Sequence, residues 1–118
     1  MPHSNRDQRG PTLGEIRATV ARLAAGGIVP IHETARALHT STRSLQRCLS
    51  GQGARYSEVS EAVRFELAVV LLRDTMLSMK TIAERLGYRD ASSFSRAFGR
   101  WAGCTPRQYR RASRGRES

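Results

Sequence analysis

The stretch from Lys80 to Phe98 reads KTIAERLGYRDASSFSRAF, and an earlier stretch from Glu33 to Leu49 reads ETARALHTSTRSLQRCL. Both contain a small alanine, a leucine three residues later, a short turn and an apolar pair four residues apart. The alanine lets two helices cross closely, and the apolar pair marks the buried face of the second helix. The sequence therefore predicts two helix-turn-helix units, whose corresponding residues are Ala35, Leu38, Leu45 and Leu49 in one and Ala83, Leu86, Phe94 and Phe98 in the other.

The chain is short and strongly basic. Its 118 residues suffice for one domain or for two small lobes. Twenty Lys and Arg residues against ten Asp and Glu give a formal net charge of +10, which is typical of a nucleic-acid binder. All the basic residues except Lys80 are arginines, the residue type suited to bidentate contacts with phosphate and guanine. The two predicted helix-turn-helix units together with this charge indicate double-stranded DNA as the partner.

Several other classes of protein are disfavoured. The two cysteines, Cys48 and Cys104, form no C-x-x-C pair, so a reducing compartment is expected and the predicted location is cytoplasmic and nucleoid-associated. His32, His39 and Cys48 do not have the spacing of a zinc site, and no cofactor is expected. No apolar run approaches the roughly 20 residues of a membrane span, and residues 1–11 lack the hydrophobic stretch of a signal peptide. No catalytic triad, carboxylate pair or phosphate-binding loop is recognisable, so the protein is not expected to be an enzyme.

The fold class predicted is all-α, because apolar residues recur at helical spacing and never in strict alternation. A capping box at Thr12 and Glu15, N-caps at Ser41 and Asp90, and the Thr105-Pro106 pair mark helix starts. Seven helices are expected: the first starts at about residue 13 and is ended by Gly26-Gly27, and the others lie at about residues 31–38, 42–50, 57–74, 79–86, 91–102 and 107–111. The corresponding organisation is a disordered leader or linker (1–11), a first lobe (12–54), a linker helix (55–75), a second lobe (76–112) and a disordered tail (113–118).

The second helix of each unit presents a polar face opposite its apolar face. On a helical wheel with about 100° per residue, Arg43 and Arg47 lie opposite Leu45 and Leu49, with Gln46 on the flank. Arginine can bind guanine and glutamine can bind adenine through two hydrogen bonds each, whereas serine is short and less selective. The residues predicted to contact bases are Arg43, Gln46, Arg47, Ser92 and Arg96.

Polar residues at helix starts and in the basic C-terminal region can donate to phosphate. The predicted phosphate contacts are Ser41, Thr42, Ser57, Arg100, Thr105, Arg107 and Arg110, with Arg111 and Arg114 as further donors. Arg64 lies inside the linker helix and is expected instead to form an ion pair or a cap with Glu61 or Glu84. Trp101 is expected to be a core residue rather than an intercalating wedge.

The run from Gly87 to Arg110, G-Y-x-D-x-S-x-F-S-R-x-F followed by G-x-T-P-x-x-Y-R, resembles the signature of the AraC-type family of bacterial transcription factors. The stretch IHETARALHTSTRSLQRCLSGQG resembles the first helix-turn-helix of that family, and the similarity extends over about residues 13–111. The resemblance implies two helix-turn-helix lobes joined by a long helix, which bind successive major-groove segments of DNA. The base-contacting positions that it implies match those obtained from the helical wheel.

The resemblance also implies RNA polymerase as a partner, and a further effector-binding or dimerisation domain for which this chain has no room. The chain is thus expected to be a piece of a longer regulator, with a stand-alone regulator as the alternative. A non-specific architectural protein would spread its arginines over all faces, whereas an interaction module would expose an apolar stripe on the linker helix. Ser92 is small for a base reader, so the second lobe is expected to contribute more affinity than specificity.

Overall fold

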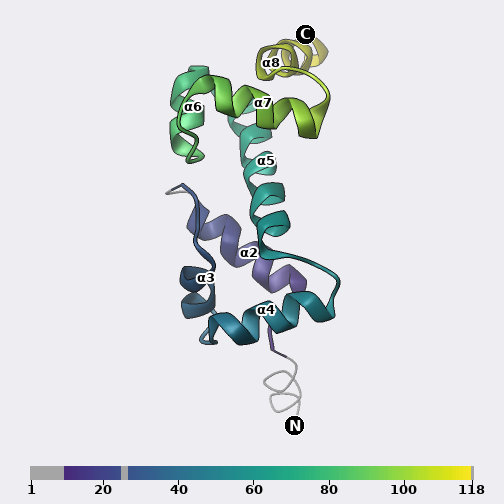
Figure 1. Cartoon of the computed structure of the whole chain (residues 1–118). Helices are drawn as coiled ribbons and strands as arrows, with labels where there is room; N and C mark the ends of the chain where they lie inside the picture. The colour runs from purple at the N-terminus through teal and green to yellow at the C-terminus, as the bar shows by residue number, and fades with distance from the viewer. Residues whose placement is uncertain (1–9, 25–26, 118) are drawn as a thin grey trace. The chain divides into compact units, whose positions relative to one another are not determined.

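The computed structural model describes residues 10–24 and 27–117 (Figure 1). Within these ranges the chain forms α-helices and no β-strand, as the sequence predicts. The helices are α2 (Leu13–Leu23), α3 (Ile31–Ala37), α4 (Thr42–Gly51), α5 (Tyr56–Asp74), α6 (Met79–Arg85), α7 (Ala91–Ala102) and α8 (Pro106–Glu117). The chain divides into two compact units, one ending at Val63 and the other beginning at Arg64, with Gly27 in the second unit. Helix α5 begins in the first unit and ends in the second.

The first unit packs α2 against α3 and α3 against α4. The start of α5 is held by Tyr56, whose hydroxyl donates to the carbonyl oxygen of Val29 at 2.8 Å and lies 2.8 Å from the Thr34 hydroxyl. Burial raises the pKa of Tyr56, so this hydroxyl stays protonated and able to donate. The buried apolar residues of this unit are Ile16, Val20, Ala24, Val29, Ala35, Leu45, Leu49, Val59 and Val63.

The second unit has an aromatic core. Phe98 is fully buried, and its ring centroid lies 5.4 Å from that of Phe65 and 5.5 Å from that of Tyr109. Trp101 packs edge-on against Phe65 at 5.5 Å, so it contributes to this core as expected. The buried residues around these rings are Ala68, Leu72, Ile82, Ala83, Leu86 and Phe94.

Local hydrogen bonds place the helix starts where the sequence predicts them. Thr12 and Glu15 form a capping box, because the Thr12 hydroxyl accepts from the Glu15 N–H and the Glu15 carboxylate accepts from the Thr12 N–H. Ser41 caps α4 and Asp90 caps α7, each accepting from a backbone N–H three residues ahead. The hydrogen bond from the Ser93 N–H lowers the pKa of Asp90. Ser78 caps α6 in the same way, by accepting from Thr81.

Both helix-turn-helix turns are closed by the same backbone hydrogen bond. The Thr40 N–H donates to Ala35 O at 2.9 Å, and the Tyr88 N–H donates to Ala83 O at 2.8 Å. The turns differ in the residue with left-handed backbone geometry, which is His39 (φ 56°) in the first and Gly87 (φ 86°) in the second. Only glycine adopts that geometry without a steric penalty.

We therefore expect His39→Gly to stabilise the first unit by about 1 kcal/mol, because the strain at a positive φ exceeds the entropic cost of adding a glycine. Urea unfolding followed by circular dichroism would measure the change. The reciprocal Gly87→His variant is the matched control and should be destabilised. A destabilised His39→Gly variant would show that the His39 side chain contributes contacts that outweigh its strain.

Six predicted helix boundaries are wrong, and three of them, the ends of α4 (Gly51) and α6 (Arg85) and the start of α8 (Pro106), are wrong by one residue each. Helix α3 ends at Ala37, one residue early, and α5 begins at Tyr56, with the Glu58 carboxylate accepting from the Arg55 N–H at 3.0 Å. Helix α8 continues to Glu117 rather than ending at Arg111, and thus includes residues 113–117 that the sequence placed in a disordered tail. One reason is tertiary: Arg114 Nη2 donates to Thr75 O at 2.8 Å, a contact 39 residues away in the sequence. The leader, 1–11, falls mostly outside the described residues.

Candidate nucleic-acid interface

Helix α4 presents the first candidate reading face. Leu45 and Leu49 are buried on one side of it, Arg43 and Arg47 are exposed on the opposite side, and Gln46 is exposed on the flank. The Ser41 cap fixes the start of the helix and therefore the direction in which each of these side chains leaves the backbone. The structure thus brings the three first-unit candidates together on one solvent-facing surface.

Cys48 ties this helix to the segment ahead of α2. Its thiol donates to Pro11 O at 2.9 Å, while the Gln52 side chain accepts from the Leu13 N–H at 3.2 Å and donates to Cys48 O at 3.1 Å. These contacts attach the C-terminal end of α4 to the segment at the start of α2. Cys48 and Gln52 thus hold α4 in place, although neither residue belongs to its candidate reading face.

Helix α7 presents the second candidate face. Phe94, Ala97 and Phe98 are buried, whereas Ser92 and Arg96 are exposed. The Arg96 Nη2 group donates to the Ser93 hydroxyl at 3.3 Å. The other N–H groups of the guanidinium remain available as donors. The second candidate face therefore has one arginine where the first has two, and its other candidate, Ser92, has a short side chain.

A hollow of about 440 Å³ opens beside the first turns of α7. Its lining includes residues predicted from the sequence to contact bases and others predicted to contact phosphates. No acidic residue lines it. Its lining is Met79, Ala91, Ser92, Ser95, Arg96, Thr105, Pro106 and Arg107. The packing of α6, α7 and α8 thus places candidate base and phosphate contacts on one continuous surface.

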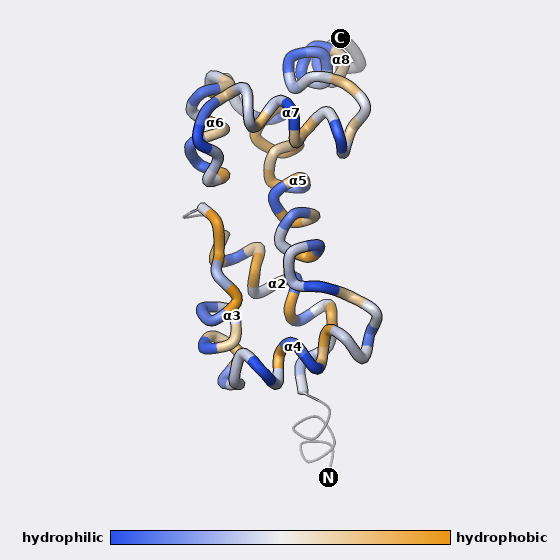
Figure 2. Tube along the Cα trace, viewed as in Figure 1, coloured by the Kyte–Doolittle hydropathy of each residue, from blue (hydrophilic) through white to orange (hydrophobic). Residues whose placement is uncertain are grey.

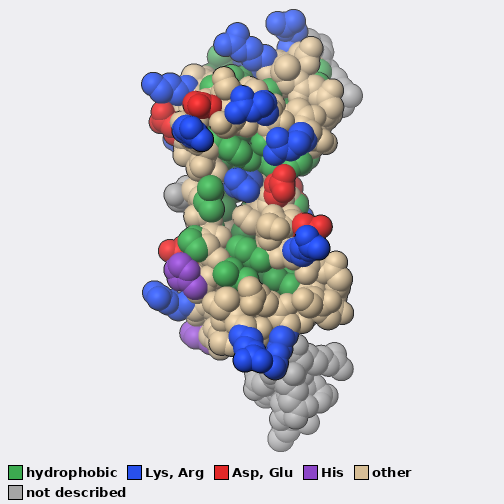
Figure 3. All heavy atoms as spheres, in the orientation of Figure 1, with side chains coloured by type: hydrophobic (Ala, Val, Ile, Leu, Met, Phe, Trp, Pro, Cys, Tyr) green, Lys and Arg blue, Asp and Glu red, His purple; other side chains and the backbone are tan. Residues whose placement is uncertain are grey.

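The phosphate candidates separate into exposed and engaged residues. Ser41, Ser57, Thr105, Arg100 and Arg107 are exposed, and Thr42 is half-buried. The Ser41 hydroxyl accepts from the Ser44 N–H and donates to the Ser44 hydroxyl at 3.0 Å, so its proton is already engaged. The Thr105 hydroxyl accepts a helix-capping hydrogen bond from the Gln108 N–H, which leaves its proton available for donation. Figure 3 shows Lys and Arg side chains standing out from the surface of each unit.

Arg110 has a structural role. Its Nε donates to Leu72 O at 2.9 Å and its Nη2 lies 3.4 Å from Leu71 O, so it caps the last turn of α5. Burial is the main cause of a lowered pKa for this guanidinium. We therefore remove Arg110 from the candidate phosphate contacts.

Arg64 also differs from expectation. Its guanidinium carbon lies over the Tyr88 ring, 5.3 Å from the centroid, and its Nε is buried without a hydrogen-bond partner among the described residues. The sequence suggested an acidic partner, whereas the structure provides the face of an aromatic ring. Arg64 thus contacts Tyr88, the residue that follows Gly87 in the second turn, and sequence reasoning did not predict this contact.

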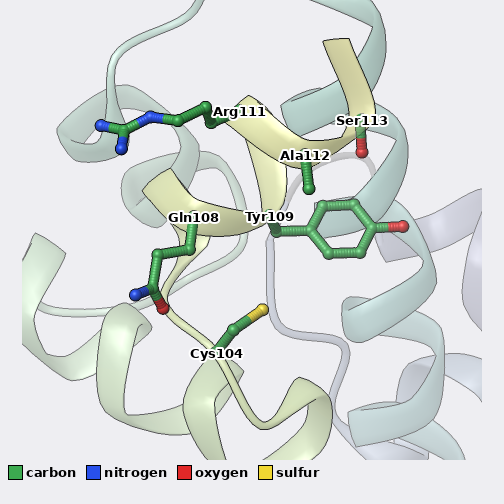
Figure 4. A pocket seen from close by; sticks show the side chains of 6 residues that line it. All are labelled: Cys104, Gln108, Tyr109, Arg111, Ala112 and Ser113. Atoms are coloured by element: carbon green, nitrogen blue, oxygen red, sulfur yellow. The ribbon is translucent and has the colours of Figure 1, made fainter. Parts of the chain in front are cut away.

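A further hollow of about 570 Å³ lies on another side of α8 (Figure 4). The Tyr109 ring, the Cys104 thiol and Ala112 face it, while the Arg111 side chain extends away from the ring (Figure 4). Among the described residues, no group of three or more His, Cys, Asp or Glu side chains is placed to hold a metal ion. The same residues include no helix long and apolar enough to cross a membrane.

The arrangement of two helix-turn-helix units, each with a polar face on its second helix, defines a double helix-turn-helix protein. A family model described as a helix-turn-helix domain matches residues 34–112. The ornithine utilization regulator of Pseudomonas aeruginosa is 46% identical over 91 residues, covering 76% of this chain and 27% of that protein. The regulator VirS of Mycobacterium tuberculosis is 37% identical over 100 residues, covering 84% of this chain and 29% of that protein. This chain thus spans about a quarter of the length of these curated relatives.

Solved structures of transcription regulators have a similar fold. The C-terminal domain of AraT, a response regulator from Geobacillus stearothermophilus, is 30% identical with a TM-score of 0.71, covering 87% of this chain and 86% of that domain. The DNA-binding domain of AdpA, a global transcriptional factor solved in complex with a target DNA, is 25% identical with a TM-score of 0.71, covering 91% and 96%. The chain belongs to the AraC-type helix-turn-helix family of transcription regulators.

Proposed function

We propose that this chain is the DNA-binding part of a bacterial transcription regulator and that it binds double-stranded DNA in a sequence-specific manner. Helices α4 and α7 enter successive major-groove segments about 34 Å apart. The main support is that both units of the repeat expose polar side chains opposite the buried residues of their second helix. A net charge of +10 supplies the attraction to the phosphate backbone.

Base reading is assigned to Arg43, Gln46 and Arg47 in the first unit and to Ser92 and Arg96 in the second. The first set combines two arginines with an amide and suits a site containing guanine and adenine. The second set has a single long side chain, so the second unit contributes less discrimination. The backbone contacts proposed are those of Ser41, Thr42, Ser57, Arg100, Thr105 and Arg107.

The wider assignments rest on the family. We propose that lobes 12–54 and 76–112, joined by the helix over 55–75, act together on one DNA site. RNA polymerase is the proposed protein partner, and an effector-binding or dimerisation domain is proposed for the complete regulator. Its location would be cytoplasmic and nucleoid-associated. The relatives are named as regulators, so we propose binding rather than catalysis as the activity.

Selection of bound sequences from a random duplex pool tests this proposal. We expect a motif of two blocks one helical turn apart, bound at least about 1,000-fold more tightly than a scrambled duplex. Affinities would be measured at two salt concentrations, because phosphate contacts make them salt-dependent. Tight binding to every duplex without enrichment would refute sequence-specific reading and indicate an architectural nucleic-acid-binding protein instead.

A further inference from the structure

Helix α8 carries a stripe of four arginines: Arg107, Arg110, Arg111 and Arg114. They lie within an arc of about 100° when residues are spaced about 100° apart. With Ser78 and Met79 they line a hollow of about 400 Å³, and no acidic residue contributes to it. Figure 2 shows α8 as a largely hydrophilic helix, in keeping with this composition.

Two of the four arginines are engaged by the fold. Arg110 donates to the carbonyl oxygens at the end of α5, and Arg114 Nη2 donates to Thr75 O at 2.8 Å. Carbonyl oxygens satisfy the N–H groups but carry no full negative charge. The positive charge of these two residues therefore remains in the hollow, and the proximity of Arg114 contributes, after burial, to the lowered pKa of Arg110.

The other two arginines, Arg107 and Arg111, are exposed and form no hydrogen bond or ion pair within the part of the chain that the structure describes. Arg111 extends away from the Tyr109 ring (Figure 4). The stripe contains like-charged pairs four residues apart, an arrangement that destabilises a helix. An anion in the hollow would relieve this repulsion and supply acceptors for the forked N–H groups of both side chains.

We propose that Arg107 and Arg111 bind one phosphate group, and that its source is the DNA backbone. The chemistry of two adjacent guanidinium groups selects a tetrahedral oxyanion. The position selects DNA over free phosphate, because Arg107 and Met79 also line the hollow in front of α7 that contains Ser92 and Arg96. This site rests on the proposed function and adds a clamp through which α8 becomes part of the DNA-binding surface.

The first experiment tests the anion site without DNA. Melting temperatures of the full chain would be measured in inorganic phosphate and in chloride at equal ionic strength and pH. The variants are Arg107→Ala with Arg111→Ala, and a control, Arg22→Ala with Arg85→Ala, that removes two exposed arginines outside the hollow. We expect phosphate to raise the melting temperature of the wild type and the control more than that of the Arg107/Arg111 variant. Equal shifts in all three proteins would overturn the site.

The second experiment identifies the source of the phosphate. Losing one backbone contact lowers the slope of log affinity against log salt by about 0.9. We expect the Arg107/Arg111 alanine variant to show this loss on selected and scrambled duplexes alike, relative to the control. A variant with lysine at both positions retains the charge and should retain most of the slope, even if the alanine variant folds poorly.

The outcomes separate this site from the proposed function. An unchanged slope together with a lost phosphate effect on melting would show a site for free anions and overturn the assignment to DNA. A reduced slope in a protein that selects no sequence would support the clamp while refuting specific reading. A slope that falls equally in the control would overturn the clamp, because any exposed arginine would then have the same effect.

Discussion

Replacing Arg47 by alanine is expected to weaken binding to the selected sequence by roughly 5- to 150-fold, the equivalent of about 1–3 kcal/mol for one bidentate base contact. Arg47 is exposed on α4 opposite the buried Leu45 and Leu49, and the Ser41 cap fixes its helix. Discrimination should be lost at one or two base pairs only. Affinity for scrambled DNA should change much less, because non-specific binding depends on phosphate contacts.

The measurement is a titration of the selected duplex, its single-base variants and a scrambled duplex at fixed salt. Arg22→Ala is the control, since it removes an exposed arginine from α2 of the same unit without touching the reading face. Equal losses on selected and scrambled duplexes for Arg47→Ala would refute its role as a base reader and place the contact on the backbone.

Replacing Phe98 by alanine is expected to destabilise the second unit by about 3–5 kcal/mol, the usual cost of removing a large buried ring. The Phe98 ring packs against those of Phe65, Phe94 and Tyr109, so three helices lose contacts at once. Since small domains have only about 5–15 kcal/mol of total stability, this unit should melt far below the wild type.

Thermal melting followed by Trp101 fluorescence would report the loss, because Trp101 packs on the same Phe65 ring. Phe98→Leu is the matched control and should retain most of the stability, as it keeps much of the apolar volume. Exposed Val70 offers a second control, since Val70→Ala removes apolar atoms from the surface. Similar melting of Phe98→Ala and Val70→Ala would refute the central place of the ring cluster.

The features predicted correctly from sequence are those set by near neighbours. The capping box at Thr12 and the caps at Ser41 and Asp90 each depend on residues three positions away, and the sequence contains both partners. The buried and exposed faces of α4 and α7 follow from helical periodicity in the same way. Local chemistry therefore determines where α4 and α7 begin and which of their faces are exposed.

The features missed depend on residues far apart in the sequence. Arg107 and Arg110 are the same residue type three positions apart, but only Arg110 reaches the carbonyls at the end of α5. The extension of α8 to Glu117 includes an Arg114 contact with Thr75, and Arg64 meets the ring of Tyr88. Periodicity and capping rules carry no information on such contacts. The sequence therefore could not distinguish arginines that make tertiary contacts from arginines that face solvent.

The shared closure of the two turns has a consequence for engineering. Since the Thr40 and Tyr88 N–H groups donate to equivalent alanines, the turns that precede α4 and α7 share the same backbone hydrogen bond. The polar face of one helix could then be transferred to the other. Arginine at Ser92 and glutamine at Ser95 would give α7 the side chains that α4 carries at Arg43 and Gln46. If α4 reads bases as proposed, a protein altered in this way should favour a direct repeat of the half-site of α4. Phe94 follows Ala83 by eleven positions whereas Leu45 follows Ala35 by ten, and this additional residue would set how closely the copy matches the original.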